Sequence, residues 1–581
     1  MEPCLVLDFP RGNAARKPLS FAAPREILCA TTIAEVRGVL RAAEARARAG
    51  AWVAGVVSYE AAPAFDAALR VRGGSALPLA WFGVFDAPIA GTAEETTSPP
   101  PDFGPWQPGI GRAHFDVDIA AIRKAIFDGE VYQVNHTLRL HGRYAGSELA
   151  LFRRLRDAQP DSYAAYLNLG RWRILSVSPE LFFRRDGRKL TTMPMKGTAR
   201  RGRWAEEDRQ CAAALRASDK NRAENLMIVD LLRNDLSRVA VPHSVRVPEL
   251  FAIERHPTVL QMTSTVTAEA RPEIGLDDIF GALFPCGSVT GAPKVKAMEL
   301  IARLEAEPRG AYCGAIGLLR PGGDAMFNVA IRSVTLDTLD GTAACGIGSG
   351  IVWDSRAADE YAETLLKSNF LDHVAADFQL LETLRLEDGH YVRLELHLAR
   401  LAASARYFRS PFDVVRCRER LDGVAAEAGR QTLRVRICLD RGGGIDVTGA
   451  PLPAAGEQPE AFAVTAMPVS RDSLWLYHKT TQREVYERAA AAHPGVFDVL
   501  LRNEQGELTE FTRGNLVMEL DGRKLTPAIG CGLLDGCLRR EMLDRGEIAE
   551  AVLTLDDLAR AQRIWFVNSL RGRIAMRRPE A

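Results

Sequence analysis

The chain has 581 residues, enough for two large domains, or for three or four at about 150 residues each. Its 74 basic and 74 acidic residues cancel, which argues against nucleic acid or an anionic membrane as the main partner. A hydrophobic share of 47% excludes dominant disorder. No apolar run of about 18 residues predicts a transmembrane helix, and the first residues lack a signal-peptide pattern. Ten cysteines without a C-x-x-C pair complete the prediction of a cytoplasmic protein with reduced thiols.

The first part of the chain begins with short apolar runs, such as residues 52–62, that predict strands or buried helices. A stretch rich in Pro, Thr, Ser and Glu from Gly91 to Pro108 predicts a surface loop or linker. Isoleucines at helical spacing then predict a helix that ends before Gly129, and VYQVNHTLRL (131–140) alternates like a strand.

A second part starts after Asp372 without an obvious linker. LLETLRLEDGHYVRL predicts two strands joined by an Asp-Gly turn, and a helix, HLARLAASARYF, follows. Another proline-rich loop is expected between Gly449 and Pro459. We therefore expect two unlike globular domains, residues 1–372 and 376–581, in a chain of the α/β (α+β) class.

Two predicted helices in the first part carry candidate metal ligands. Glu224 lies near the start of one helix, and Glu360, Glu363 and Lys367 share one face of the other. Carboxylates from two helices suit Mg²⁺, although acidic residues on helices are more often plain solvated surface. The glycine clusters CGSVTGAPK (286–294) and GIGSG (346–350) favour the functional interpretation, because their backbone N–H groups can face a carboxylate without steric hindrance.

These motifs, taken with SPELFFRRDGRKLTTMPMKGTARRG, ENLMIVDLLRNDL, RGAYCGAIG, FNVAIRS and GIGSGIVWDS, resemble in order the chorismate-utilising enzymes. That family includes anthranilate, isochorismate, salicylate and aminodeoxychorismate synthases. The resemblance covers residues 115–371 and implies a large domain of antiparallel sheets around a Mg²⁺-dependent chorismate site. It implies Mg²⁺ ligands at Glu224 and Glu363, with Glu360 nearby. The groups that it implies for the substrate carboxylates are Thr290, Tyr312, Arg332, Gly348, Ser349 and Gly350.

A few positions indicate which reaction the resemblance implies. Gln133 stands where isochorismate-type members have a water-activating lysine, which disfavours water addition. In the turn Pro194–Thr198, Lys196 replaces the alanine usual in anthranilate synthases, and a desolvated amine there can displace the 4-hydroxyl of chorismate. Glu180 matches the family's general acid/base. Gln261 replaces a histidine found in many members and removes one proton-transfer candidate. The short N-terminal part makes an allosteric amino-acid site doubtful.

Ammonia has no source within the sequence. The chain lacks the nucleophilic cysteine with partner His and Glu of a glutaminase, so ammonia is expected from solution or from a separate glutamine amidotransferase subunit.

In the second part, LETLRLEDG, HLARL, HKTTQR, GELTEFTRGNLVM, KLTPAIGCGLLDGCLRREML and FVNSLRG resemble the pyridoxal-phosphate fold-type IV family, which includes D-amino-acid and branched-chain aminotransferases and aminodeoxychorismate lyase. The resemblance implies that Lys479 bonds to the cofactor and that Glu510 faces its ring nitrogen. For the phosphate it implies Arg400, the backbone near Leu538 and the Ser569 hydroxyl. Thr383 is the expected aid to proton transfer. The family's usual first strand and G-D-G-x-F segment are missing.

Together the two resemblances imply synthesis of 4-aminobenzoate for folate. Chorismate and ammonia would give 4-amino-4-deoxychorismate, and the second domain would then eliminate pyruvate. An anthranilate-type synthase fused to a fold-type IV aminotransferase is the alternative enzyme, and an inactive scaffold is the alternative class. A homodimer is a further expectation, because fold-type IV domains often pair.

Overall fold

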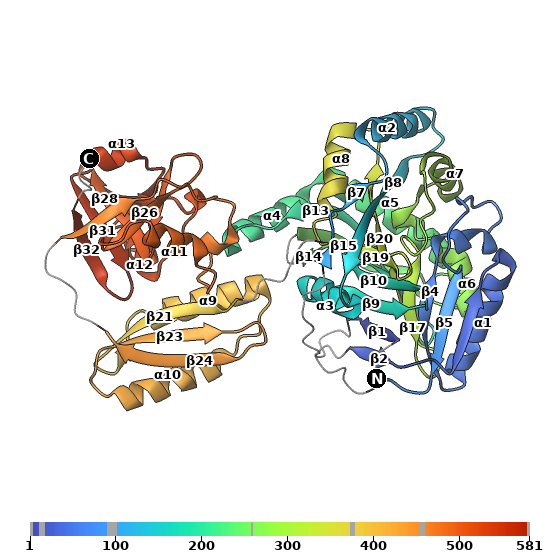
Figure 1. The fold of residues 1–581 in the computed structure, drawn as a ribbon, viewed down its shortest axis with the longest axis horizontal. Helices are drawn as coiled ribbons and strands as arrows, with labels where there is room; N and C mark the ends of the chain where they lie inside the picture. The colour runs from blue at the N-terminus through green and yellow to red at the C-terminus, as the bar shows by residue number, and fades with distance from the viewer. Residues whose placement is uncertain are drawn as a thin grey trace. The chain divides into compact units, whose positions relative to one another are not determined.

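The computed structural model describes residues 4–10, 18–89, 102–256, 259–371, 378–452 and 459–577 (Figure 1). Two compact units divide the chain. The first contains Met1–Arg200 and Ala212–Ala375, and the second contains Arg201–Cys211 and Ala376–Ala581.

The first unit is built on two antiparallel sheets. The first sheet has the spatial order β16 (Gly291–Ala292), β8 (Gln133–Ala145), β20 (Thr342–Ile351), β19 (Ser333–Asp337), β10 (Trp172–Ser178), β9 (Tyr163–Asn168), β1 (Leu5–Asp8), β2 (Leu19–Phe21), with β6 (Asp102–Phe103) and β7 (Gln107–Pro108) also on β8. The second has the order β13 (Met195–Arg200), β15 (Val259–Glu269), β12 (Lys189–Met193), β11 (Leu181–Asp186), β18 (Ala325–Val329), β17 (Ala315–Leu319), β4 (Trp52–Val57), β5 (Ala80–Phe85), β3 (Glu26–Ala30), with β14 (Arg246–Arg255) on β15.

The helices of the first unit cover the outer faces of these sheets. They are α1 (Ile33–Arg48), α2 (Arg112–Phe127), α3 (Glu148–Ala158), α5 (Asp219–Ser237), α6 (Leu276–Leu283), α7 (Lys294–Leu304) and α8 (Ala357–Leu366). Apolar side chains of α2, α3 and α7 pack against the first sheet, and those of α1, α5 and α6 pack against the second. A third cluster, which includes Leu7, Val56, Trp81 and Ile316, joins β1 of the first sheet to β4, β5 and β17 of the second. The result is a two-sheet sandwich with helices on both sides.

Local sequence explains how these elements begin and pair. Helix α1 starts at a capping box in which the Glu35 carboxylate accepts from the Thr32 N–H. The buried Val36 and Leu40 of this helix lie one turn apart. The longest pairing joins β8 and β20 from Val134–Ile351 to Arg143–Thr342. This pairing brings the GIGSG cluster beside the strand that begins at Gln133.

The second unit has a four-stranded antiparallel sheet and a mixed eight-stranded sheet. The small sheet has the order β22 (His390–Tyr391), β21 (Leu380–Glu387), β23 (Leu433–Leu439), β24 (Ile445–Pro451). The large sheet has the order β27 (Leu508–Phe511), β26 (Asp498–Arg502), β25 (Glu460–Val464), β32 (Gly572–Arg577), β31 (Arg563–Asn568), β28 (Gly514–Leu520), β29 (Arg523–Pro527), β30 (Ala549–Ala551). Its helices are α9 (Leu394–Phe408), α10 (Val414–Ala428), α11 (Glu484–Ala491), α12 (Cys537–Asp544) and α13 (Leu555–Arg560), and the helix α4 (Ala205–Ala217) begins in this unit.

Most predicted elements are confirmed. The helix before Gly129 is α2, the alternating strand is β8, and Asp388 and Gly389 form the hairpin turn with positive φ angles. All ten cysteines are free thiols, and no helix among the described residues is long and apolar enough to cross a membrane.

Some loop predictions differ from the structure or lie beyond what it describes. Pro194–Thr198 is not a simple turn, because Met195 onward forms strand β13. Gly197, with a φ of 94°, lies where the register of β13 shifts against β15. The loop predicted from Gly91 to Pro108 lies outside the described residues up to 101, and its remainder contains β6 and β7. Of the loop predicted from Gly449 to Pro459, the first residues belong to β24 and residues 453–458 lie outside the described part.

Candidate active sites

Lys196 projects from β13 toward the GIGSG cluster on β20. A methyl group placed on Gly350 would lie 2.9 Å from Lys196 Nζ and 2.3 Å from the Gln133 amide nitrogen. Only glycine at this position leaves room for both side chains. Burial lowers the pKa of Lys196, the charge of Lys367 lowers it further, and Glu224, Glu180 and Glu363 oppose the shift. The amine therefore releases its proton more readily than a surface lysine does.

Glu180, between β10 and β11, is buried close to this amine. The Ser288 hydroxyl donates to Glu180 Oε1 at 2.7 Å, and the Glu180 N–H donates to Ser178 Oγ at 3.2 Å. Burial raises the pKa of Glu180 to about 7, although the Ser288 hydroxyl, the charge of Lys196 and the Met195 N–H all act in the opposite direction. A carboxyl group with this pKa can give up or take a proton near neutrality.

The predicted metal ligands lie on α5 and α8. Glu360 accepts a hydrogen bond from Ser355 at 2.7 Å, and Glu363 pairs with Lys367 at 2.9 Å with a side chain that is 60% exposed. In the part of the chain that the structure describes, the one group of three acidic, His or Cys ligand atoms within 4.8 Å of one another is elsewhere, at Glu382, His397 and Cys537. Glu224, Glu360 and Glu363 therefore do not form a closed cluster.

Arg332 supplies a cation without an acidic partner among the described residues. Its guanidinium donates to Gln159 Oε1 at 2.9 Å, and burial lowers its pKa to about 10. Its φ of 47° is in the left-handed region that non-glycine residues rarely adopt, so the local backbone is strained. Because its neighbour is a neutral amide, this buried guanidinium can still form two parallel hydrogen bonds with the carboxylate of a ligand.

Other predicted substrate groups are held by contacts with their neighbours. The Thr290 hydroxyl donates to the Cys286 carbonyl at 3.1 Å, and its own carbonyl accepts from the Asn135 N–H at 2.8 Å. A methyl group on Gly346 would lie 2.4 Å from the ring of Tyr312, so that ring packs directly against β20. On the same strand, Ser349 accepts from the Thr364 hydroxyl at 3.3 Å, while Gly348 accepts from Lys367 at 3.0 Å through its carbonyl.

Gln261 has a structural role beside Lys196. Its amide donates to the Gly197 carbonyl at 2.8 Å and accepts from the Thr198 hydroxyl at 2.9 Å. The glutamine therefore clamps the irregular part of β13 that carries the amine.

The second unit contains a cavity of about 410 Å³ in which Lys479 lies with Thr383, Arg400, Glu510 and Ser569. Lys479 follows a short 3-10 turn and precedes Thr480, which bridges to Leu380 at the start of β21. Burial and the charge of Arg400 lower the pKa of Lys479 to about 8, against the pull of Glu382 and Glu510. This second amine therefore also releases its proton more readily than a surface lysine does.

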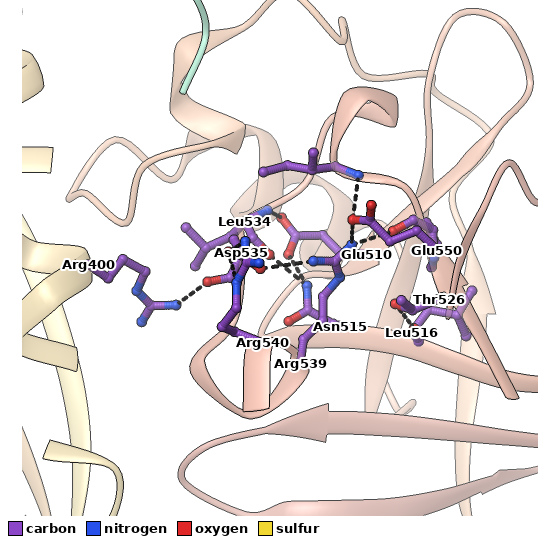
Figure 2. Close-up of polar contacts among 12 residues, drawn as sticks. Arg400, Glu510, Asn515, Leu516, Thr526, Leu534, Asp535, Arg539, Arg540 and Glu550 are labelled. Atoms are coloured by element: carbon purple, nitrogen blue, oxygen red, sulfur yellow. Dashed lines mark hydrogen bonds and ion pairs between the residues drawn. The ribbon is translucent and has the colours of Figure 1, made fainter. Parts of the chain in front are cut away.

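Glu510 on β27 is buried and fully engaged. Its Oε1 accepts from the Tyr486 hydroxyl at 2.8 Å. Its Oε1 also accepts from the Leu534 N–H at 3.1 Å, and its Oε2 accepts from Asn515 at 3.3 Å (Figure 2). Burial raises the pKa of Glu510 to about 7. The carboxyl is rigidly held and would gain stabilisation from a cationic ring nitrogen.

The predicted phosphate group Arg400 is already paired. Its guanidinium donates to Glu382 at 2.8 and 2.7 Å. It also donates to the Asp535 carbonyl at 3.0 Å (Figure 2). Despite burial, this guanidinium and His397 hold the pKa of Glu382 at about 2. His397 in turn contacts Ser569 Oγ at 2.8 Å. Leu538 lies in the first turn of α12, whose leading N–H groups have no partner within the helix.

Comparisons with known proteins agree with this arrangement. Residues 11–372 match the chorismate binding enzymes. The chain belongs to this family. Residues 379–578 match the class IV aminotransferases, a match that implies pyridoxal phosphate.

Similar members of the chorismate-binding family come from several organisms. Aminodeoxychorismate synthase component 1 of Escherichia coli is 43% identical over 275 residues, which is 47% of this chain and 60% of that protein. Anthranilate synthase component 1 of Aquifex aeolicus is 37% identical over 271 residues, 47% of this chain and 54% of that protein. The crystal structure of anthranilate synthase component I from Streptococcus pneumoniae covers 64% of this chain and 91% of its own, with 26% identity and a TM-score of 0.51. The chain thus spans about 60% of the length of the E. coli relative.

The sequence motifs do not predict several residues that lie at the two sites of this chorismate-binding family member. Ser288 lies inside a motif that was recognised only for its glycines and Thr290. Gln159 is far in sequence from Arg332, and no motif links them. In the second unit, Glu382 and His397 are adjacent to recognised positions, and Arg434 and Arg436 on β23 line the cavity. Of these, only the arginines carried a signal, since two like charges alternate along the apolar segment that forms β23.

Proposed function

We propose that the chain makes 4-aminobenzoate from chorismate in two reactions, one in each unit. The observation that carries the proposal is the position of Lys196 Nζ against Gly350, where the acid Glu180 and the helical carboxylates Glu224 and Glu363 act on its charge. A second desolvated lysine in the class IV unit supports the second reaction.

In the first reaction, Arg332 and the N–H groups of the GIGSG strand hold the carboxylates of chorismate. The Lys196 amine forms a bond to the ring as the bond to the 4-hydroxyl breaks, and Glu180 gives that oxygen its proton, so that water leaves. Ammonia then bonds to the 4-carbon as the bond to Lys196 breaks, and the electron pair returns to the amine. The product is 4-amino-4-deoxychorismate.

Glu224 and Glu363, with Glu360 nearby, fit Mg²⁺ as an ion that keeps part of its water. Both carboxylates act electrostatically on Lys196, and the exposed Glu363 forms an ion pair with Lys367. Such an open pair suits a metal that is completed by water and a ligand carboxylate rather than a closed protein cage. The ion would neutralise a carboxylate of chorismate while Arg332 holds the other.

The cavity around Lys479 fits pyridoxal 5′-phosphate, because an amine, a buried acid and a helix N-terminus line one space of about 410 Å³. When bound, the cofactor withdraws electrons from the amino-bearing carbon of the substrate. Glu510 would face the ring nitrogen, and the first turn of α12 with Ser569 and Arg400 would hold the phosphate. Lys479, with Thr383 beside it, moves the proton that is lost before pyruvate leaves. Arg434 and Arg436 at the same cavity suit a substrate with two carboxylates.

Ammonia is the remaining substrate. The relatives from E. coli and A. aeolicus are each named component 1 of a synthase, which supports a second subunit as the source of ammonia. We infer that this subunit is a glutamine amidotransferase.

The test is to incubate the purified chain with chorismate, Mg²⁺ and ammonium at alkaline pH and to identify the aromatic amine. The proposal predicts 4-aminobenzoate and pyruvate. Release of 2-aminobenzoate would instead identify an anthranilate-type synthase, a reading that the A. aeolicus relative keeps open. No product from chorismate would contradict both enzymes.

A further inference from the structure

Residues Arg201–Cys211 interrupt the first unit in sequence and belong to the second unit in space. Strand β13, which carries Lys196, precedes this segment, and α5, which carries Glu224, follows it. The segment contains the start of α4 and reaches the class IV unit through both polar and aromatic contacts.

Two arginines anchor the segment in buried ion pairs. Arg201 and Asp208 bond at 2.6 Å with side chains that are 5% and 6% exposed, and Arg203 bonds Glu207 at 3.0 Å. The Arg201 guanidinium lies over the ring of Tyr407 at 4.3 Å. Because each charge is paired before it meets the aromatic surface, the segment is desolvated without leaving an unpaired ion.

The backbone of the segment contacts the residue next to Lys479. His478 Nε2 lies 3.1 Å from the Arg203 carbonyl, and Ser404 Oγ lies 2.9 Å from His478 Nδ1. A carbonyl only accepts, so Nε2 carries the hydrogen and Nδ1 accepts from Ser404. The Tyr407 hydroxyl donates to the Gly202 carbonyl at 2.8 Å, and the rings of Tyr407 and His478 are 4.4 Å apart. The orientation of His478 is therefore set partly by residues from the segment.

A second route leads from the segment to Glu510. Trp204 stacks on Tyr477 with a centroid distance of 5.2 Å and an angle of 24°, and it packs on the apolar cluster that contains Tyr486. Tyr486 is the residue whose hydroxyl donates to Glu510. Trp204 thus supports the neighbours of both groups that are expected to hold the cofactor, Lys479 through Tyr477–His478 and Glu510 through Tyr486.

We propose that Arg201–Cys211 is an integral part of the class IV unit and that Trp204 and Arg203 are positioning residues for the Lys479 and Glu510 sides of its cavity. The occupant of the surface formed by Tyr407, Tyr477 and His478 is thus a segment of the same chain, inserted between the strand of Lys196 and the helix of Glu224. The boundary of the class IV domain is discontinuous, and residues 376–581 alone lack part of its fold. The inference concerns cavity construction and holds whichever reaction the cavity performs.

The test compares the full-length wild-type chain with Trp204→Ala, the conservative Trp204→Phe and the control Arg209→Ala, all without cofactor. Arg209 lies on α4, which begins directly after Trp204, but its side chain is 70% exposed and its ion pair is with Glu206 of that helix. Loss of the aromatic stack should speed hydrogen exchange of residues 474–482 about tenfold in Trp204→Ala. Trp204→Phe should restore most of the protection, and Arg209→Ala should match the wild type. Strand β31 in the second unit reports on unfolding of that unit and should exchange at the wild-type rate in all variants.

Binding of pyridoxal phosphate, followed by its absorbance, gives a second readout, and we expect about tenfold weaker binding in Trp204→Ala. If the second unit unfolds in Trp204→Ala, as loss of protection in β31 would reveal, the variant Tyr407→Phe removes only the hydroxyl that reaches Gly202. That variant should still speed exchange in residues 201–211 and 474–482. Unchanged exchange and unchanged cofactor binding in the folded variant would overturn the proposal. Because no substrate is used, this result is independent of the proposed reactions.

Discussion

The two desolvated lysines of the chain lie in unlike surroundings. Burial lowers the pKa of both Lys196 and Lys479. Around Lys479 the acids are saturated, since Arg400 and His397 hold Glu382 while Tyr486 and Asn515 hold Glu510. In the first unit Glu224 is half-buried on its helix, Glu363 is exposed and paired with Lys367, and Arg332 has an amide for its neighbour. The comparison teaches that a desolvated amine alone does not define a site: beside Lys479 the buried carboxylates already have hydrogen-bond partners, whereas in the first unit the helical carboxylates and Arg332 still suit a cation and an anion.

Exchanging each lysine for alanine gives the largest expected effect and separates the two reactions. Lys196→Ala should lower amination of chorismate by about 10³-fold or more, since the attacking amine is lost. The same variant should still convert supplied 4-amino-4-deoxychorismate to 4-aminobenzoate. Lys479→Ala should do the reverse. Both rates are measured from the release of product, with Lys189→Ala as an exposed-lysine control. Full amination by Lys196→Ala would remove the covalent role of that amine.

The open anion site predicts a strong effect on binding. Gln159→Glu would place a carboxylate next to Arg332, where the amide oxygen now accepts at 2.9 Å. The new charge competes with the carboxylate of chorismate, so KM should rise by about 10- to 100-fold while kcat changes little. Gln159→Met removes the hydrogen bond without adding charge and should have a smaller effect. Steady-state kinetics with saturating ammonium measure both, and an unchanged KM in Gln159→Glu would show that Arg332 does not hold the substrate.

Replacement of Lys479 should stabilise the folded second unit by an amount that depends on pH. The pKa of Lys479 is about 8 in the folded chain, below its usual 10.5, so the folded state binds fewer protons than the unfolded state between these values. Its burial therefore costs stability fully below pH 8, and the cost disappears as the pH rises toward 10.5. Lys479→Met should stabilise the cofactor-free second unit below pH 8 by on the order of 2–3 kcal/mol.

Urea dependence of hydrogen exchange in β27 and β28, compared at pH 7 and pH 10, measures this difference. The exposed Lys524→Met is the control. An equal gain at both pH values would show that the lost charge is not the cause.

Much of both sites was predictable from the sequence, and the failures have a common origin. Lys196, Glu180, Lys479 and Glu510 were found because each sits in a local motif, and strand β8 was evident from alternation. Ser288 and Gln159 were missed because their roles arise from contacts across 108 and 173 residues of chain, which no local pattern records. Arg400 was expected to be free for phosphate, but its pairing with Glu382 depends on helix α9 packing against β21. The discontinuous course of Arg201–Cys211 is likewise a tertiary property.

The smallest predicted effect concerns the acid beside Lys196. The pKa of Glu180 is about 7, above its usual 4.5, so this carboxyl is protonated and able to donate below pH 7. The Ser288 hydroxyl stabilises the carboxylate form, and its removal in Ser288→Ala should raise the pKa of Glu180 by about half a unit to one unit. The pH above which amination falls should move upward by the same amount, while the rate below pH 6 stays within about twofold. Ser288→Thr keeps the hydroxyl and should retain the wild-type profile. Conversion of 4-amino-4-deoxychorismate, measured on the same samples, should not shift. A limb that does not move in Ser288→Ala would mean that a group other than Glu180 governs the fall in amination at high pH.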